Sequence, residues 1–147
     1  MQFILHLDPQ EEDERVEVYA REERPLLQEL ETLTLGHRGR RYLVGLTGQG
    51  HKLIPYSQAY LFFTRAKRVW VRTPQGEYPI RERLFELEEI LDARHFVRIS
   101  NSEIVNISQI DSLDFSRAGS ITLQLKDGHT TYVSRRALAR FKKSLGI

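Results

Sequence analysis

Three short stretches combine basic, amide or hydroxyl side chains with sequence typical of turns. They are Arg65-Ala66-Lys67-Arg68, Ser100-Asn101-Ser102 and Ser134-Arg135-Arg136. Lysine, arginine and serine donate hydrogen bonds to phosphate, while asparagine and arginine can pair bidentately with base edges. Side chains in turns can project outward because they are not tied into a sheet ladder. The candidate contacts to a nucleic acid are therefore Arg65, Lys67, Arg68, Asn101, Ser102, Ser134, Arg135 and Arg136.

Each stretch also has a purely structural interpretation. A basic hairpin tip can protect a strand edge, Asn and Ser are common in ordinary turns, and a basic helix face can simply be solvated. The stretch Ser134 to Arg136 is the most informative because it begins a predicted helix. Arginines at a helix N-terminus act against the helix dipole unless they face an anion.

The charge distribution is consistent with a polyanionic partner. Residues 1–35 carry ten acids against three arginines, a net charge of −7. Residues 36–147 carry ten acids against nineteen Lys and Arg, a net charge of +9. This asymmetry indicates a basic body with an acidic appendage, although the same charges would also keep an ordinary protein in solution.

The residues do not suggest a catalytic or metal centre. The sequence has no cysteine, and its five histidines lack metal-ligand spacing. No serine lies in a nucleophile elbow, and the consecutive acids Glu11 to Glu14 are typical of a hydrated loop. No apolar run is long enough to span a membrane, and the acidic N-terminal stretch is unlike a secretory or transit signal. We expect a cytoplasmic protein that is not an enzyme and has no cofactor and no small-molecule substrate.

The spacing of apolar residues predicts a mainly β (α+β) fold in two domains. Residues 1–39 are predicted to form an acidic strand-strand-helix extension, and residues 40–147 the main domain. Strands are predicted over residues 41–46, 52–54, 60–64, 69–73, 78–80, 96–100, 103–106, 110–115 and 121–125, and helices over 81–91 and 134–145.

Two local signals refine the C-terminal part. Asp127-Gly128 predicts a two-residue hairpin turn, which places Leu123 opposite Tyr132. Ser134 is predicted to cap the N-terminus of the last helix, with Gly146 at its end.

One run of residues resembles a family signature. The run Phe96-Val97-Arg98-Ile99-Ser100-Asn101-Ser102-Glu103-Ile104-Val105-Asn106 is similar to the signature of LytTR DNA-binding domains. In that family, F-x-R-[aliphatic]-[His/Ser]-x-S-x-[aliphatic]-V-N follows a short helix rich in Leu and Glu, like Leu84 to Leu91. An L-x-D-G hairpin like Leu125 to Gly128 and a V-S-R-[Arg] stretch like Val133 to Arg136 follow in the same order. The resemblance covers roughly residues 42–146.

The resemblance implies an elongated stack of small antiparallel sheets with short helices. It also implies a bacterial transcription regulator whose loops enter successive major grooves of double-stranded DNA and bend the duplex. Carried over by position, the first loop holds Arg65, Lys67 and Arg68, the second Asn101 and Ser102, and the third Arg135 and Arg136. Arg98, on the signature strand, would contact phosphate or brace the second loop.

Some positions depart from the family pattern. Many members have His at the position of Ser100, a basic residue at Asn101 and an aromatic residue at Glu103. Fewer cations in the second loop should weaken binding to the DNA backbone.

The N-terminal extension and the family resemblance each suggest a protein partner in addition to DNA. We expect the N-terminal extension to continue the sheet or to build a homodimer. The family includes regulators without a receiver domain, some held by a membrane partner, so an inhibitory membrane protein is a further candidate.

Two other functions remain alternatives. One is an RNA-binding β module. The other is a protein-interaction module in which the acidic segment masks the basic body or docks a partner.

Overall fold

The computed structural model describes residue 19, residues 42–116 and residues 118–147. The chain divides into two units, Met1–Gly39 and Arg40–Ile147. The fold described below belongs to the second unit. Apart from Tyr19, the predicted N-terminal extension of residues 1–39 lies outside the described residues.

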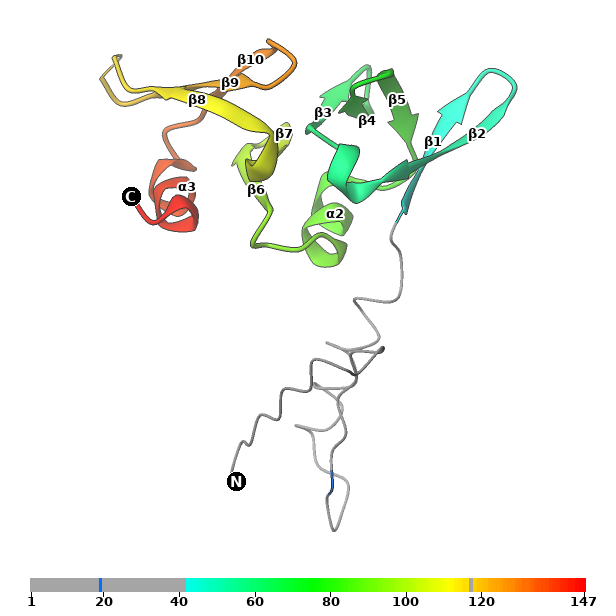
Figure 1. The fold of residues 1–147 in the computed structure, drawn as a ribbon, viewed down its shortest axis with the longest axis horizontal. Helices are drawn as coiled ribbons and strands as arrows, with labels where there is room; N and C mark the ends of the chain where they lie inside the picture. The colour runs from blue at the N-terminus through cyan, green and yellow to red at the C-terminus, as the bar shows by residue number, and fades with distance from the viewer. Residues whose placement is uncertain (1–18, 20–41, 117) are drawn as a thin grey trace, which may run out of the picture. The chain divides into compact units, whose positions relative to one another are not determined.

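The second unit is built from three antiparallel sheets (Figure 1). A two-stranded sheet pairs β1 (Tyr42–Thr47) with β2 (Gly50–Pro55). The largest sheet has the strand order β5-β4-β3-β7-β6, from β3 (Leu61–Arg65), β4 (Arg68–Thr73), β5 (Gly76–Ile80), β6 (Phe96–Ser100) and β7 (Glu103–Asn106). A third sheet has the order β10-β9-β8, from β8 (Ile110–Asp114), β9 (Ile121–Leu125) and β10 (Thr130–Val133).

Short helices connect and cover these sheets. The α-helices are α2 (Leu84–Ile90) and α3 (Leu138–Leu145), and the 3-10 turns are η1 (Tyr56–Gln58) and η2 (Ile107–Gln109). The side chain of Glu86 caps α2 by accepting a hydrogen bond from the backbone N–H of Arg83. Helix α3 ends at Gly146, whose φ of 70° is the left-handed conformation that favours glycine. The predicted mainly β fold of small antiparallel sheets and short helices is confirmed.

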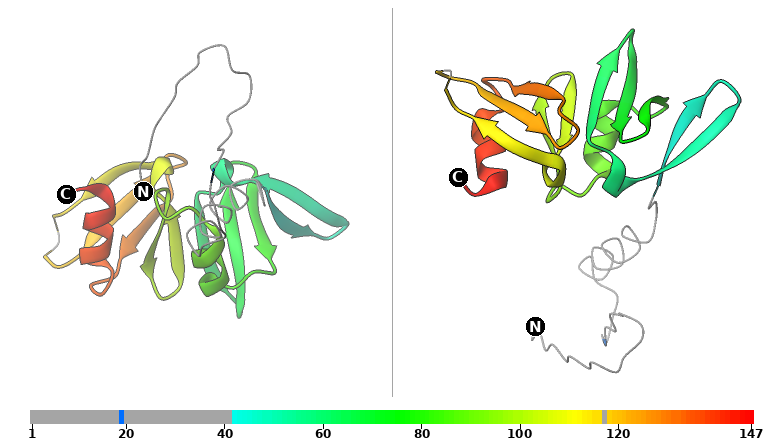
Figure 2. Two further views of the ribbon diagram at one scale, coloured as in Figure 1. Left: turned by 90° about the horizontal axis from the view of Figure 1, so that it is seen from below. Right: turned by 45° about the horizontal axis from the view of Figure 1, so that its top comes forward.

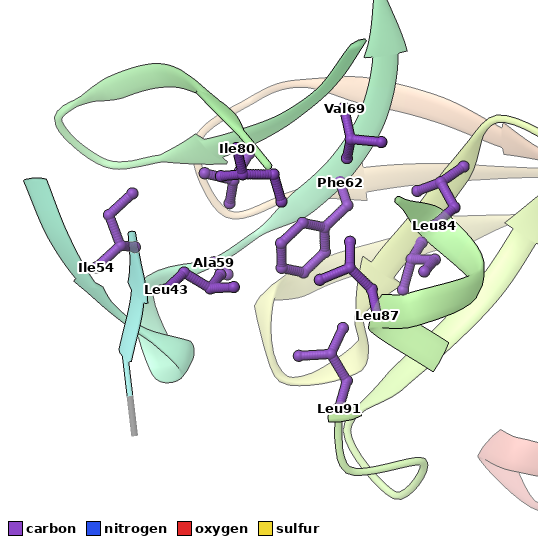
Figure 3. Packing of buried hydrophobic residues seen from close by; sticks show 11 residues of the cluster. Leu43, Ile54, Ala59, Phe62, Val69, Ile80, Leu84, Leu87 and Leu91 are labelled. Carbon is purple, nitrogen blue, oxygen red and sulfur yellow. The ribbon is translucent and has the colours of Figure 1, made fainter. Parts of the chain in front are cut away.

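The five-stranded sheet is buried on both faces. Phe62 packs on one face with the apolar side of α2 and with the β1–β2 hairpin, in the cluster that Figure 3 shows. The neighbouring Leu61 packs on the opposite face with the three-stranded sheet and with Phe141 of α3. Because β-strand side chains alternate between faces, both residues can be fully buried only in a sheet covered on each side. The predicted apolar face of α2, Leu84, Leu87 and Leu91, is buried as expected.

The hairpin between β9 and β10 differs from the prediction by one residue. Leu123 pairs with Thr131 and not with Tyr132, which faces Thr122 instead. The backbone N–H of Leu125 donates to His129, and only Gly128 in this turn has a positive φ, 86°. The turn therefore has three residues and ends in a left-handed glycine, whereas a two-residue turn needs positive φ at both positions. The extra residue moves Tyr132 to the outer face, where it is 53% exposed.

The start of the last helix also differs from the prediction. Helix α3 begins at Leu138, its N-cap is Ala137, and no side chain caps it. The carbonyl of Ser134 accepts a hydrogen bond from the N–H of Ala137, which closes a turn before the helix. Ser134 is therefore not the N-cap. Ser134 belongs instead to a turn that follows directly from strand β10, so the helix begins later than the cap preference of serine predicted.

Candidate nucleic-acid interface

The first two basic or amide stretches lie at the same end of the five-stranded sheet. Strand β3 pairs with β4 on one side, where Arg65 faces Arg68, and with β7 on the other, where Phe63 faces Glu103. The N–H of Thr64 donates to the carbonyl of Ser102 at 3.1 Å. The β3–β4 turn and the β6–β7 loop are therefore neighbours at one end of the sheet.

The third stretch joins them through strand β6. The N–H of Ser134 donates to the carbonyl of Ile99 at 2.8 Å, two residues before the β6–β7 loop begins at Asn101. Thr131 Oγ1 donates to the carboxylate of Glu103, which ties β10 to β7. The left view of Figure 2 shows the β3–β4 turn, the β6–β7 loop and the turn before α3 on the same lower side. The structure thus brings together all three stretches that the sequence singled out.

The β3–β4 turn has an unusual backbone. It is a two-residue hairpin turn in which Ala66 and Lys67 have φ values of 51° and 64°. Positive φ at both central residues is the geometry of a type I′ turn, which normally carries Asn or Gly. Residues without a suitable side chain hold this geometry at an energetic cost, and such strain concentrates at functional sites. Nothing in the sequence of this turn indicates it, because glycine is absent.

The three basic residues of the β3–β4 hairpin have different surroundings. Arg65 pairs with Glu77 at 2.7 Å and lies over the rings of Phe63 and Trp70, at 4.9 and 5.2 Å from their centroids. Its guanidinium is therefore drawn back along the sheet. Lys67 and Arg68 are exposed, and no carboxylate of residues 42–116 or 118–147 pairs with either of them.

Arg98 holds the β6–β7 loop in place. Its Nε donates to the carbonyl of Ser100 at 3.0 Å and its Nη2 to the carbonyl of Asn101 at 2.6 Å. Its Nη1 pairs with Glu88 of α2 at 2.7 Å. All three groups of the guanidinium fork are thus engaged, which orients the loop relative to the helix. Of the two interpretations left open by the sequence, this geometry matches bracing.

The β6–β7 loop presents Asn101 outward. Asn101 and Ser102 are both exposed. Ser102 is the less free of the two, because its N–H donates to Ser100 Oγ at 3.2 Å and its hydroxyl lies 3.3 Å from the same oxygen. The amide of Asn101 is therefore the side chain of this loop best placed to reach an external group.

The turn before α3 carries two exposed arginines, Arg135 and Arg136. A Cβ added at Gly119, in the loop between β8 and β9, would lie 3.7 Å from Nε of Arg135. The side chain of Arg135 thus lies along that loop. No hydrogen bond or ion pair involves the Arg136 side chain among the described residues.

Two carboxylates outside the three turns have lowered pKa values. Hydrogen bonds from the side chain and backbone of Arg94 lower the pKa of Asp92 to about 2. Burial acts to raise the pKa of Asp127, but hydrogen bonds from the His129 backbone and the Arg72 side chain outweigh it and lower the pKa. Both groups are ionised at neutral pH and act as structural anions.

The three turns together present two cations that pair with no described carboxylate, an outward amide and two further arginines at one end of the five-stranded sheet. Comparison with known proteins shows that residues 49–146 match the model of the LytTr DNA-binding domain. The chain belongs to the LytTR DNA-binding family. It is 40% identical over 105 residues to an uncharacterised HTH-type transcriptional regulator of Staphylococcus aureus strain NCTC 8325, covering 71% of each chain. A regulator of the same description in the bovine strain RF122 matches with the same identity and coverage.

A solved structure shares the fold of this LytTR domain. The LytTr DNA-binding domain of a methyl-accepting/DNA response regulator from Bacillus cereus superposes with a TM-score of 0.72. The match covers 74% of this chain and all of that one, at 24% sequence identity. The S. aureus relatives are described as HTH-type, yet α2 and α3 are separated here by β6 to β10. Within residues 42–116 and 118–147, no two α-helices follow one another as a helix-turn-helix requires.

Membership of the LytTR family makes the chain a DNA-binding transcription regulator of bacterial type rather than a member of an enzyme class. The part of the chain that the structure describes contains no cluster of three or more His, Asp or Glu that could hold a metal ion. None of the described helices is long and apolar enough to cross a membrane.

Proposed function

We propose that this LytTR protein binds double-stranded DNA sequence-specifically by inserting its three turns into successive major grooves. The observation that carries the proposal is the position of the β3–β4 turn, the β6–β7 loop and the β10–α3 turn at one edge of the scaffold. A major groove of B-DNA admits secondary-structure elements and displays a distinct pattern of donors and acceptors for each base pair.

The residues divide into two roles. Lys67, Arg68 and Arg135 neutralise phosphates, release counterions and set the register of the protein on the duplex. Asn101 and Arg136 read base edges, because an asparagine amide matches adenine and an arginine fork matches guanine. Ser102 and Ser134 support the backbone of their turns.

Two sequence-derived contacts take modified roles in this proposal. Arg65 is neutralised by Glu77, so it shapes the β3–β4 hairpin more than it binds phosphate. Arg98 is a positioning residue that holds the carbonyls of Ser100 and Asn101.

The duplex is bent in the complex. A scaffold with two continuous cores holds the turns at fixed separations, so the duplex is the partner that adjusts its shape when all three turns bind. Bending costs of order 1–6 kcal/mol for a site of 20–30 base pairs and is offset by the extra contacts it permits.

Selection of binding sites from a random duplex pool, followed by a footprint of the recovered site, tests the proposal. We expect a preferred element with protection in neighbouring major grooves on one side of the helix. Recovery of no preferred sequence would contradict the proposal. Competition with structured and single-stranded RNA separates an RNA-binding module from a DNA-binding one, because the narrow A-form major groove excludes side chains. Absence of binding to either nucleic acid at low salt would favour a protein-interaction module.

We further propose that the protein acts in the cytoplasm as a homodimer and that a membrane protein can inhibit it. A dimer would bind two copies of the element spaced by whole helical turns. Sedimentation of the full chain over a range of concentrations tests this, and a constant monomer with a single-element operator would contradict it.

A further inference from the structure

A groove lies on the α2 side of the β3–β4 hairpin, and cations dominate its walls. Its volume is about 480 Å³. The cations that line it are Lys67, Arg68, Arg81, Arg83 and Arg98, against the single carboxylate of Glu82. Its floor is apolar, from Val69, Ile80 and Leu84.

Most of this positive charge is not balanced within the described residues. Arg98 pairs with Glu88, but no ion pair of residues 42–116 or 118–147 involves Lys67, Arg68, Arg81 or Arg83. All four of these side chains are exposed. Like charges gathered on one surface repel one another, and an external anion relieves that repulsion.

The groove is continuous with the three-turn edge. Lys67 belongs to the β3–β4 turn, and Arg98 lines the groove while it holds the carbonyls of Ser100 and Asn101. A ligand lying in the groove would therefore touch the turn that enters one major groove and approach the loop that enters the next. Arg81 and Arg83 lie outside the three stretches that the sequence singled out.

The form of the groove favours an extended polyanion. Its cations come from the β3–β4 hairpin (Lys67 and Arg68), from the segment between β5 and α2 (Arg81 and Arg83) and from β6 (Arg98), and they line an open groove rather than a closed cage. Phe85 of α2 also lines the groove and is 59% exposed, which provides an apolar surface beside the charges. A sugar-phosphate strand presents a matching row of anions with less polar sugars between them.

We propose that this groove binds the sugar-phosphate backbone that flanks the major groove entered by the β3–β4 turn, with Arg81 and Arg83 as phosphate ligands. The proposal rests on the proposed function, and extends the DNA contacts beyond the three turns. Phosphate contacts position a protein without reading sequence, so Arg81 and Arg83 contribute affinity and not base preference.

The test is the salt dependence of duplex binding by the full chain carrying Arg81→Gln and Arg83→Gln together. The slope of log K against log salt is negative, and each lost phosphate contact reduces its magnitude by about 0.9. We therefore expect the magnitude of the slope to fall by about 2. Affinity for the selected site and for random duplex should fall by the same factor, and the selected sequence should not change. A hydroxyl-radical footprint should lose protection on one flank only.

A matched control removes the same charge elsewhere. Lys126→Gln with Arg140→Gln alters two exposed residues that do not line the groove and form no ion pair among the described residues, and should leave the slope within experimental error. Arg81→Lys with Arg83→Lys keeps both charges and should restore most of the slope. Thermal melts of all variants show whether each remains folded.

Three results would overturn the proposal. They are an unchanged slope in the Arg81→Gln and Arg83→Gln protein while wild type binds its selected site, an equal loss in the control, or a change in the selected sequence. In each case the proposed function still stands. Failure of the wild-type protein to bind any duplex would instead remove the proposed function and this inference together.

Discussion

At the scale of single residues, neighbours in the chain meet different surroundings. Arg65 and Lys67 stand two positions apart, yet Glu77 neutralises one and no described carboxylate pairs with the other. The positive φ of Lys67 places it at the tip of a type I′ turn, while Arg65 lies back over two aromatic rings. A basic residue contributes to phosphate binding only if its charge is available, so these two should behave differently.

Replacing Lys67 with Ala should weaken binding to all duplex sequences alike and reduce the salt slope by about one. Arg65→Ala should reduce the slope by much less, because its charge is already paired with Glu77. Binding isotherms at four or five salt concentrations, on selected and random duplex, measure both effects. Equal slope losses for the two variants would show that the ion pair does not hold Arg65 away from DNA.

Arg136→Ala should cost about 1–3 kcal/mol of specific binding and relax base preference at one position. The reason is the loss of a bidentate donor that phosphate contacts cannot replace. Repeating the site selection with the variant identifies the relaxed position. Arg135→Ala is the matched comparison, since its side chain lies along the β8–β9 loop and should affect affinity more uniformly. Equal losses on random and selected DNA for Arg136→Ala would exclude a reading role.

At the scale of elements, α2 positions the β6–β7 loop through one arginine. The three contacts of Arg98 connect Glu88 of α2 with the carbonyls of Ser100 and Asn101. The buried leucines of α2 pack that helix against the sheet. Because Arg98 connects the loop to α2, the core also fixes the position of the loop.

Arg98→Met should therefore lower specific affinity about tenfold while affinity for random duplex changes little. The loop would keep its residues but lose the two hydrogen bonds that aim Asn101. Arg98→Lys should recover only part of the ratio of specific to random affinity, because a lysine cannot reproduce the planar guanidinium fork. Arg94→Met, at the other end of β6, is the control and should leave the ratio unchanged. A uniform loss on both duplexes would instead mean that Arg98 itself contacts phosphate.

The loop that follows α2 carries a pH-dependent contact. Asp92 accepts hydrogen bonds from the Arg94 backbone and side chain, and its pKa is lowered to about 2. A carboxyl whose pKa is depressed on folding stabilises the fold above its unfolded pKa, near 4, and loses that contribution as pH falls toward 2. Asp92→Asn should therefore lower the urea midpoint at pH 7, and the difference from wild type should narrow between pH 4 and pH 2. A difference that stays constant over this range would contradict the assignment.

At the scale of the whole second unit, ion pairs and hydrogen bonds couple the three-stranded sheet to the five-stranded one. Arg72 of β4 pairs with Glu77 at 3.0 Å and with Asp127, in the β9–β10 turn, at 2.7 Å. Near the proposed DNA edge, Thr131 bonds to Glu103 and Ser134 to Ile99. The spacing of the three turns is therefore set by contacts at both ends of β10.

Arg72→Met should lower the free energy of unfolding by about 1–3 kcal/mol, because two partly buried carboxylates lose a charged donor. It should also weaken specific binding more than random binding, since the third turn would be held less firmly relative to the first two. Urea unfolding and duplex titration measure the two effects. The exposed Arg140→Met is a control for stability and should change it by less than about 0.5 kcal/mol.

Much of the fold and the three turns could be predicted from local patterns. The alternation of Ile121, Leu123 and Leu125 predicts a strand with one buried face, and all three are buried. The leucines of α2 at helical spacing are likewise buried. The sequence predicted where the turns are, because turn residues and apolar periodicity depend on neighbours in the chain.

What the sequence by itself determined was therefore the order of the elements, part of the core and the positions of three polar turns. The tertiary structure alone decided that the register of β10 follows a three-residue turn, that Glu77 neutralises Arg65 and that Arg98 braces the second loop. It also decided that Arg81 and Arg83 lie beside Lys67. The physical reason is that periodicity and turn preference act over a few residues of chain. Ion pairs, registers and grooves depend instead on which strands become neighbours in space.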